Sequence, residues 1–241
     1  MASNSEVGHA KNVANLQKLI QQVSVFSNYN PPVEYLKISE LETLYNQALQ
    51  QLGEVDTKRN AYKDAIYARQ VAFEDLKETS TKIINQLEIL NLSQGKIDQA
   101  KSLNREIQGS KIKKVPNPDQ PVPDADPHST SRQSYTQLAA NFSTLLELLS
   151  TLPEYQPNEE ELTVAKLTDY NNTLLSSTLP VDQTLAEFNN QLIQRNNLFY
   201  KEDTGLYSIA QNVKKYVKSV YGATSPEFAA VSDIKFTDQK P

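Results

Sequence analysis

Two arginines, Arg69 and Arg195, are the side chains whose type and placement suggest chemistry most directly. Each is expected inside the apolar stripe of a long helix, with a phenylalanine four residues further on. A guanidinium in such a stripe must find acceptors, because an unpaired charge in an apolar setting is costly. One interpretation is a small-ligand or anion site between two repeats, near both arginines. The other is a buried polar contact that fixes helix register, with Glu202 as the partner of Arg195, and this structural role is the better attested one.

Tyrosines in two short connections between helices form the second candidate group. Tyr29 precedes Pro31, and Tyr155 precedes Pro157 in the same arrangement. A ring that packs over the helix ends explains this pattern in structural terms, because the ring is apolar and the hydroxyl can reach a polar partner. An aromatic platform for a ligand is the alternative interpretation.

Most catalytic arrangements are excluded by the composition of the chain. There is no cysteine, and the two histidines, His9 and His128, fall in an N-terminal stretch and a proline-rich stretch. The sequence therefore predicts no metal site that uses histidine, no Ser-His-Asp or Cys-His nucleophile and no cofactor. We expect no enzymatic activity. Four carboxylates shared by two repeats are better explained as helix caps and solvated side chains than as a cation site: Glu34, Asp56, Glu160 and Asp182.

The elements that must position these residues form an internal repeat with an offset of 126 positions. The register runs without a gap from Asn15 against Asn141 to Leu90 against Tyr216. Most positions that differ exchange one apolar residue for another, so the periodic core pattern is kept. One long unit that is duplicated once predicts a pseudo-two-fold arrangement rather than a solenoid.

Apolar residues at helical spacing predict three helices in each repeat, one of them long. Gly53 is expected to end the second helix and Asp56 to cap the third, with Asp182 as the matching cap in the second repeat. A shorter helix is expected to end at Gly109. The predicted helices cover about 10–26, 39–52, 56–91 and 97–108, then 132–152, 159–177 and 182–221.

The fold class predicted from these elements is all-α: an internally duplicated, elongated helical bundle. Residues 1–9 are expected to form a polar tail and residues 10–112 the first helical repeat. Five prolines within residues 113–131 predict an extended linker. Residues 132–241 form the second repeat, and both repeats are expected to pack as one bundle.

The C-terminal region carries a resemblance to a known family. The stretch from Val213 to Phe228, VKKYVKSVYGATSPEF, is followed by Ile234-Lys235-Phe236. It resembles the C-terminal signature of a family of uncharacterised, internally duplicated, all-helical bacterial proteins. The resemblance implies the same fold and implies no known activity.

Composition limits the classes of partner. The net charge of −5 argues against nucleic acid, which favours a basic surface. Neither a signal peptide nor an apolar stretch of membrane-spanning length is visible, so a cytoplasmic location is expected. We expect a non-enzymatic structural or protein-interaction protein that binds protein partners or self-associates. The alternative function is binding of a small ligand or anion near Arg69 and Arg195.

Overall fold

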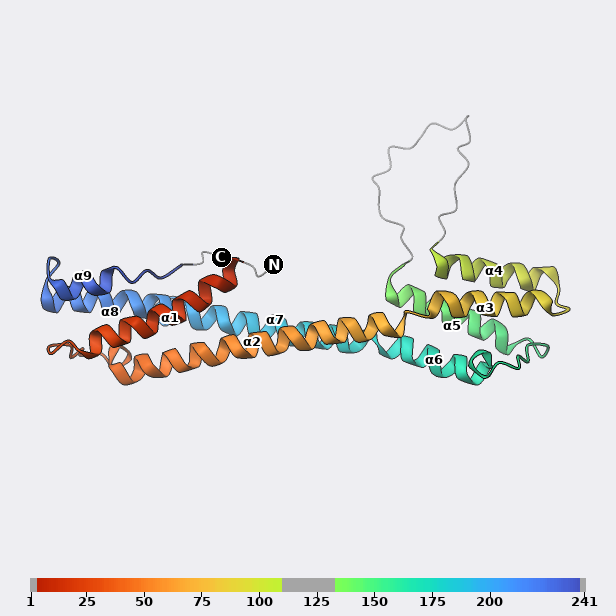
Figure 1. Cartoon of the computed structure of the whole chain (residues 1–241), viewed down its shortest axis with the longest axis horizontal. Coiled ribbons are helices and arrows are strands. Elements are labelled where there is room, and N and C mark those ends of the chain that lie inside the picture. Colours follow the sequence, from red (N-terminus) through yellow and green to blue (C-terminus); the bar gives the residue numbers. More distant parts are fainter. Residues whose placement is uncertain (1–3, 110–132, 239–241) are drawn as a thin grey trace, which may run out of the picture. The chain divides into compact units, whose positions relative to one another are not determined.

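The computed structural model describes residues 4–109 and 133–238, and these residues form helices and turns with no β-strand (Figure 1). The all-α prediction is therefore confirmed. The expected proline-rich linker, residues 113–131, lies outside the described residues, as does His128. In chain order the helices are α1 (Asn4–Ser24), α2 (Ile38–Ala72), α3 (Leu76–Ile89), α4 (Gln94–Gln108), α5 (Tyr135–Ser150), α6 (Val164–Ser176), α7 (Thr178–Tyr200), α8 (Leu206–Tyr221) and α9 (Pro226–Ser232), with short 3-10 turns at η1 (Glu34–Leu36) and η2 (Glu160–Leu162).

The chain divides into two compact units that cut across the two predicted repeats. Unit 1 comprises residues 1–62 and 184–241, and unit 2 comprises residues 63–183. Each unit therefore contains helices from both predicted repeats. The hydrophobic core of each unit is built from side chains that lie on both sides of the segment 110–132.

The core of unit 1 forms where α1 packs against α8 and α9, with the start of α2 alongside (Figure 1). Leu16 and Leu19 of α1 are fully buried, as are Val213 and Val217 of α8. Burying a side chain of this size stabilises the fold by roughly 1.5–3 kcal/mol. The buried residues of α8 repeat every three or four positions, which places them on one face of the helix.

The core of unit 2 forms among α3, α4, α5 and α6, which contact one another in that order. Phe142 and Leu145 of α5 are fully buried, as are Ile83 of α3 and Ile107 of α4. α4 ends at Gly109, which adopts the left-handed conformation with φ 79°. A helix end at this glycine is confirmed.

Corresponding positions are buried in both units. Leu19 and Leu145, Leu41 and Leu167, and Phe73 and Phe199 are each separated by 126 positions, and all six side chains are buried. The 3-10 turns η1 and η2 begin and end at positions with the same separation. α2 and α6 also start 126 positions apart.

The long helices have other boundaries than the sequence predicts. α2 runs through Gly53 and Asp56, the expected helix end and helix cap. A glycine inside a helix costs only about 1 kcal/mol, and burial of the nearby Val55 offsets that cost. The carboxylate of Asp56 pairs with Arg59 one turn further on, at 2.7 Å. Asp182, the second expected cap, likewise lies inside α7.

Each predicted long helix is also interrupted. Residues 73–75 separate α2 from α3, and Phe73 turns into the core of unit 2. Residues 201–205 separate α7 from α8. In this second break Asp203 has φ 62°, and a Cβ on Gly205 would lie 2.7 Å from backbone atoms of the residue four positions earlier, so the turn requires glycine. The apolar periodicity continues across both breaks and does not reveal them.

Candidate functional site

Arg195 lies on α7 in unit 1 and is only 5% exposed. Its Nε and Nη2 atoms donate to the side-chain oxygen of Asn196, at 3.2 and 2.9 Å. Glu202, the predicted partner, is exposed in the turn after α7, and no ion pair between the described residues joins it to Arg195. The pairing of Arg195 with Glu202 therefore stays a prediction, and the side-chain amide oxygen of Asn196 accepts from the guanidinium.

His9 shares the interior of unit 1 with Arg195 and was assigned incorrectly by the sequence. α1 begins at Asn4, so most of the predicted polar tail is helical, and His9 is fully buried. Its ring meets Phe199 edge-to-face, with centroids 5.1 Å apart and an interplanar angle of 82°. The ring of Tyr200 also contacts it, with the ring centroids 5.4 Å apart. Burial raises the pKa of Tyr200, and the positive charge of Arg195 acts in the opposite direction.

Arg69 lies on α2 in unit 2 and is half-buried. Its guanidinium carbon sits over the ring of Tyr135, 4.3 Å from the centroid. Tyr135 in turn meets Phe73 edge-to-face at 4.8 Å. A cation over an aromatic face is stabilised by about 1 kcal/mol, more when water is excluded. Aromatic packing therefore contributes to the position of Arg69, although its buried Nε has no hydrogen-bond partner among the described residues. The two arginines belong to different compact units.

The surroundings of the two arginines contain a shared pattern that the sequence comparison missed. His9 and Tyr135 are separated by 126 positions, as are Phe199 and Phe73. Each pair forms an edge-to-face contact within its own unit. The gap-free repeat register begins at Asn15 and stops six residues short of His9. Continued upstream, the same register pairs His9 with Tyr135, which lies in the predicted helix 132–152, and so places His9 on a helix.

The tyrosines of the two connections have the same local structure. The hydroxyl of Tyr29 donates to the carbonyl of Leu36 at 2.7 Å, and that of Tyr155 donates to the carbonyl of Leu162 at 2.9 Å. Burial raises the pKa of Tyr29, and burial raises the pKa of Tyr155 to about 12. The adjacent Pro31 is buried and Pro157 is half-buried. These contacts support the structural interpretation of the two turns.

A basic groove lies in unit 1 between α8 and the segment that follows α9. Its volume is about 400 Å³. Lys214 Nζ lies 5.3 Å from the ring centroid of Phe236, and Lys218 Nζ lies 5.6 Å from that of Phe228. We call this surface the lysine groove. It is lined by Gln211, Lys214, Lys215, Lys218, Phe228, Ser232, Lys235 and Phe236.

The segment that borders this groove, residues 233–238, is held by polar side chains, and we call it the strap. Asn12 donates to the carbonyl of Thr237 and accepts from its amide, both at 2.8 Å. Asn15 donates to the carbonyl of Lys235 at 2.6 Å. Lys214 donates to the carbonyl of Ile234. The buried asparagines of α1 are therefore explained by the strap.

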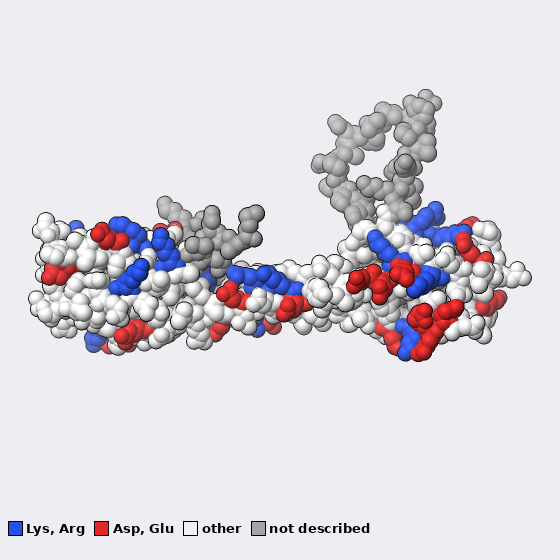
Figure 2. All heavy atoms as spheres, viewed as in Figure 1, with Lys and Arg blue, Asp and Glu red and all other residues white. Residues whose placement is uncertain are grey.

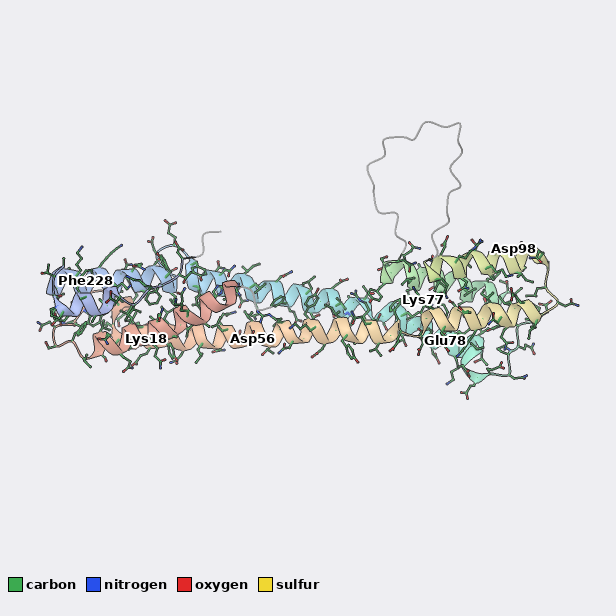
Figure 3. All side chains as sticks on the ribbon, turned by 45° about the horizontal axis from the view of Figure 1, so that its top comes forward. Lys18, Asp56, Lys77, Glu78, Asp98 and Phe228 are labelled. Carbon is green, nitrogen blue, oxygen red and sulfur yellow. The ribbon has the colours of Figure 1, made fainter. Side chains whose placement is uncertain are left out.

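A second hollow lies on the other side of the strap, with a volume of about 340 Å³. Lys11 and Lys18 of α1 line it together with Lys235, and Asp233 is the acidic residue among its lining. Figure 2 shows Lys and Arg side chains gathered over α1 and α8 of this unit, and Figure 3 labels Lys18 and Phe228 there. Six lysines thus surround α9 and the strap.

The lysine groove was not among the candidate sites expected from the sequence. Its lysines and phenylalanines all belong to the C-terminal signature quoted above, from Val213 to Phe228 and Ile234 to Phe236. The feature of the sequence that indicates this groove is the spacing of Lys214, Lys215 and Lys218, which places basic side chains on adjoining faces of one helix.

Unit 2 has polar features of another kind. Ser80 of α3, fully buried, donates to the side-chain oxygen of Asn104 on α4 at 2.8 Å. Gln108 completes this contact by donating to the carbonyl of Lys77 at 2.7 Å. An open hollow of about 380 Å³ is lined by Lys82, Glu159 and Glu161 among others. No three potential metal ligands cluster within the described residues.

None of the described helices combines the length and apolarity needed to cross a membrane. Comparisons with protein-family models, with curated proteins and with solved structures found no match to this chain.

Proposed function

We propose that this protein is a non-enzymatic helical protein that acts by binding protein partners or a second copy of itself through exposed helix faces. The observation that carries this proposal is a set of apolar side chains exposed at corresponding positions. Leu49 and Leu175 are each 52% exposed, and Tyr67 and Ile193 are 68% and 58% exposed. Each pair is separated by 126 positions. A large apolar side chain left in water at one position is ordinary, but its recurrence in both repeats indicates a surface that is covered in use.

The helix geometry within unit 1 supports a contact face. Asp56 and Asn60 lie seven and eleven positions beyond Leu49 on α2, close to two and three full turns of an α-helix, so they share its face and are exposed. An apolar side chain within a polar face suits a reversible protein contact better than a permanent core.

We further propose that the chain is an internal duplication with a pseudo-two-fold relation between its repeats. Three kinds of matched feature support this proposal. The tyrosine hydroxyls of the two connections bond corresponding carbonyls. The edge-to-face contact of His9 with Phe199 corresponds to that of Tyr135 with Phe73. The buried apolar positions of the two cores correspond as well.

The alternative, an anion or ligand site near Arg69 and Arg195, has less support. Arg195 donates to Asn196 and Arg69 lies over Tyr135, so packing already accounts for the contacts given above. The three hollows described above are lined by other residues.

The test replaces exposed apolar residues with lysine and compares them with a matched polar pair. In the test variant Leu49→Lys is combined with Ile193→Lys. The control combines Asn46→Lys with Asn190→Lys, two exposed residues on the same helices. We expect sedimentation to show self-association of the parent protein, or photocrosslinkers at 49 and 193 to capture a partner. The test variant should lose this association and the control should keep it. Equal behaviour of both variants would contradict the proposal.

A further inference from the structure

We propose that the lysine groove of unit 1 binds a short acidic peptide segment of a protein partner, with an apolar side chain of that peptide seated beside Phe228 and Phe236. This inference goes beyond the proposed function, because it concerns other residues and names the chemistry of the partner. Its success or failure is independent of the tests at Leu49 and Ile193.

The groove has walls that are fixed before any partner arrives. α8 forms one side, and the strap forms the other. The strap is anchored by Asn12 and Asn15 of α1 and by Lys214 of α8. Binding to a preformed groove avoids the entropy cost of ordering a loop.

The charges that line the groove are nearly all positive. Lys214 donates to the strap, and the exposed Lys215 and Lys218 are the next residue and the residue about one turn further along α8. Lys235 enters from the strap, and Lys11 and Lys18 extend the basic surface on its far side. Burial is the main cause that lowers the pKa of Lys214, and the positive charge of Lys235 lowers it further. The negative charge of Asp233 acts in the opposite direction. The charged residues that line the groove are four lysines, and they favour a negatively charged occupant.

The aromatic rings distinguish the kind of negative occupant. Phe228 and Phe236 are half-buried, so their exposed parts form apolar walls within the basic surface. A free phosphate would use the lysines and leave these walls in water. A peptide that carries carboxylates on either side of an apolar residue matches both features. The lining from Gln211 to Lys218 covers about two turns of helix, which suits a few residues of extended chain.

Two other classes of anionic partner fit less well. Nucleic acid favours arginine forks and stacked aromatic faces, whereas the cationic residues of this groove are lysines and two of them lie over the phenylalanine rings. A membrane surface favours protruding apolar or aromatic side chains beside the basic ones, and both phenylalanines pack against the core of unit 1.

The experiment measures binding of the full chain to a short fluorescein-labelled peptide of aspartate and glutamate around a central leucine. Fluorescence anisotropy is recorded for the parent protein and for a variant that combines Lys215→Glu with Lys218→Glu. The matched control combines Lys63→Glu with Lys201→Glu, which makes the same change in net charge at exposed lysines outside the groove. Circular dichroism confirms that all three proteins are equally helical.

We expect the groove variant to bind the peptide at least about tenfold more weakly than the parent, corresponding to about 1.4 kcal/mol. The control should stay within about twofold of the parent, and a peptide with glycine in place of leucine should bind more weakly to the parent. Equal losses in both variants would show unspecific charge attraction and overturn the proposal. Tighter binding of inorganic phosphate, phosphatidylserine vesicles or single-stranded DNA, with the same dependence on Lys215 and Lys218, would overturn it in favour of that ligand.

Discussion

Arg195 in unit 1 and Arg69 in unit 2 occupy corresponding positions in the sequence but have different surroundings. Arg195 is buried and donates to an amide oxygen. Arg69 is half-buried and lies over an aromatic ring. Two neighbouring residues differ between the units: His9 stands where unit 2 has Tyr135, and the acceptor Asn196 stands where unit 2 has Gln70. The larger phenol ring presents a face to the cation, whereas the guanidinium in unit 1 uses the neighbouring amide.

The helices α1 and α5, which correspond in the repeat, also carry different residues on their buried faces. α1 carries Asn12 and Asn15 on its buried face, and α5 carries Leu138 and Asn141 at the corresponding positions. The two asparagines of α1 are used to hold the strap. The strap therefore explains the two buried asparagines of α1, whereas the side-chain nitrogen of the buried Asn141 has no hydrogen-bond partner among the described residues.

The largest effect is expected from separating the two repeats. Each core combines residues from both sides of the segment 110–132, so residues 1–112 or 132–241 alone would expose the apolar faces of several helices. We expect each fragment alone to be poorly helical or aggregated, and the two expressed together to form a stable complex. Circular dichroism and gel filtration measure this. Two independently folded, monomeric fragments would show that each repeat is its own domain.

The comparison of the two arginines is tested by truncating each. Arg195→Ala should lower the free energy of unfolding by about 3 kcal/mol, because it leaves a void in the core and strands the polar partners of the guanidinium. Arg69→Ala should cost about 1 kcal/mol, the size of a cation–aromatic contact. Urea unfolding curves of the two variants provide the measurement. Equal costs would contradict the difference in surroundings.

The polar face of α1 is tested by giving it the residue of α5. Asn12→Leu introduces the side chain found at the corresponding Leu138 and removes two hydrogen bonds to Thr237. We expect a loss of about 2 kcal/mol in the free energy of unfolding, at about 1 kcal/mol for each bond. Hydrogen exchange at the amide of Thr237 should become faster. Asn190→Leu, at an exposed position, is the control, and unchanged exchange in Asn12→Leu would show that other contacts hold the strap.

The two tyrosine turns should respond alike, with small effects. Tyr29→Phe and Tyr155→Phe each remove one hydrogen bond and should cost about 1 kcal/mol. The folded protein holds the phenol proton of Tyr155 up to a pKa of about 12, whereas an unfolded chain releases it near 10. Stability from this group is therefore complete below about pH 10 and is lost as the pH rises toward 12. Unfolding midpoints across this range should fall less steeply in Tyr155→Phe.

The apolar pattern of the sequence was sufficient for the helical fold and for many core positions. Leu19 with Leu145 and Phe73 with Phe199 were paired in the repeat register, and all four are buried. The expected end at Gly109 was also correct. These features depend on local periodicity and on a backbone angle that favours glycine, both of which are visible in the sequence.

The helix breaks and the polar contacts depended on tertiary packing that local sequence does not reveal. Gly53 resembles a helix end, but α2 continues through it and buries Val55 two residues further on. Phe73 continues the helical spacing, yet the chain turns there to bury its ring. The sequence pointed to a charged partner for Arg195 and did not reveal that the adjacent Asn196 accepts from its guanidinium. The lysine groove required α8, α9 and the strap to meet, which spacing along one helix could not show.

The composition of the two cores also sets an order of events during synthesis. The core of unit 2 uses residues between Phe73 and Leu174, one continuous stretch of chain. The core of unit 1 joins Val13 and its neighbours to α8 and to Val231 near the C-terminus. At about 5–20 residues per second on the ribosome, the apolar face of α1 waits on the order of tens of seconds for its partners. Nascent chains should therefore acquire unit 2 first, and α1 is the segment for which a chaperone has the longest time to compete.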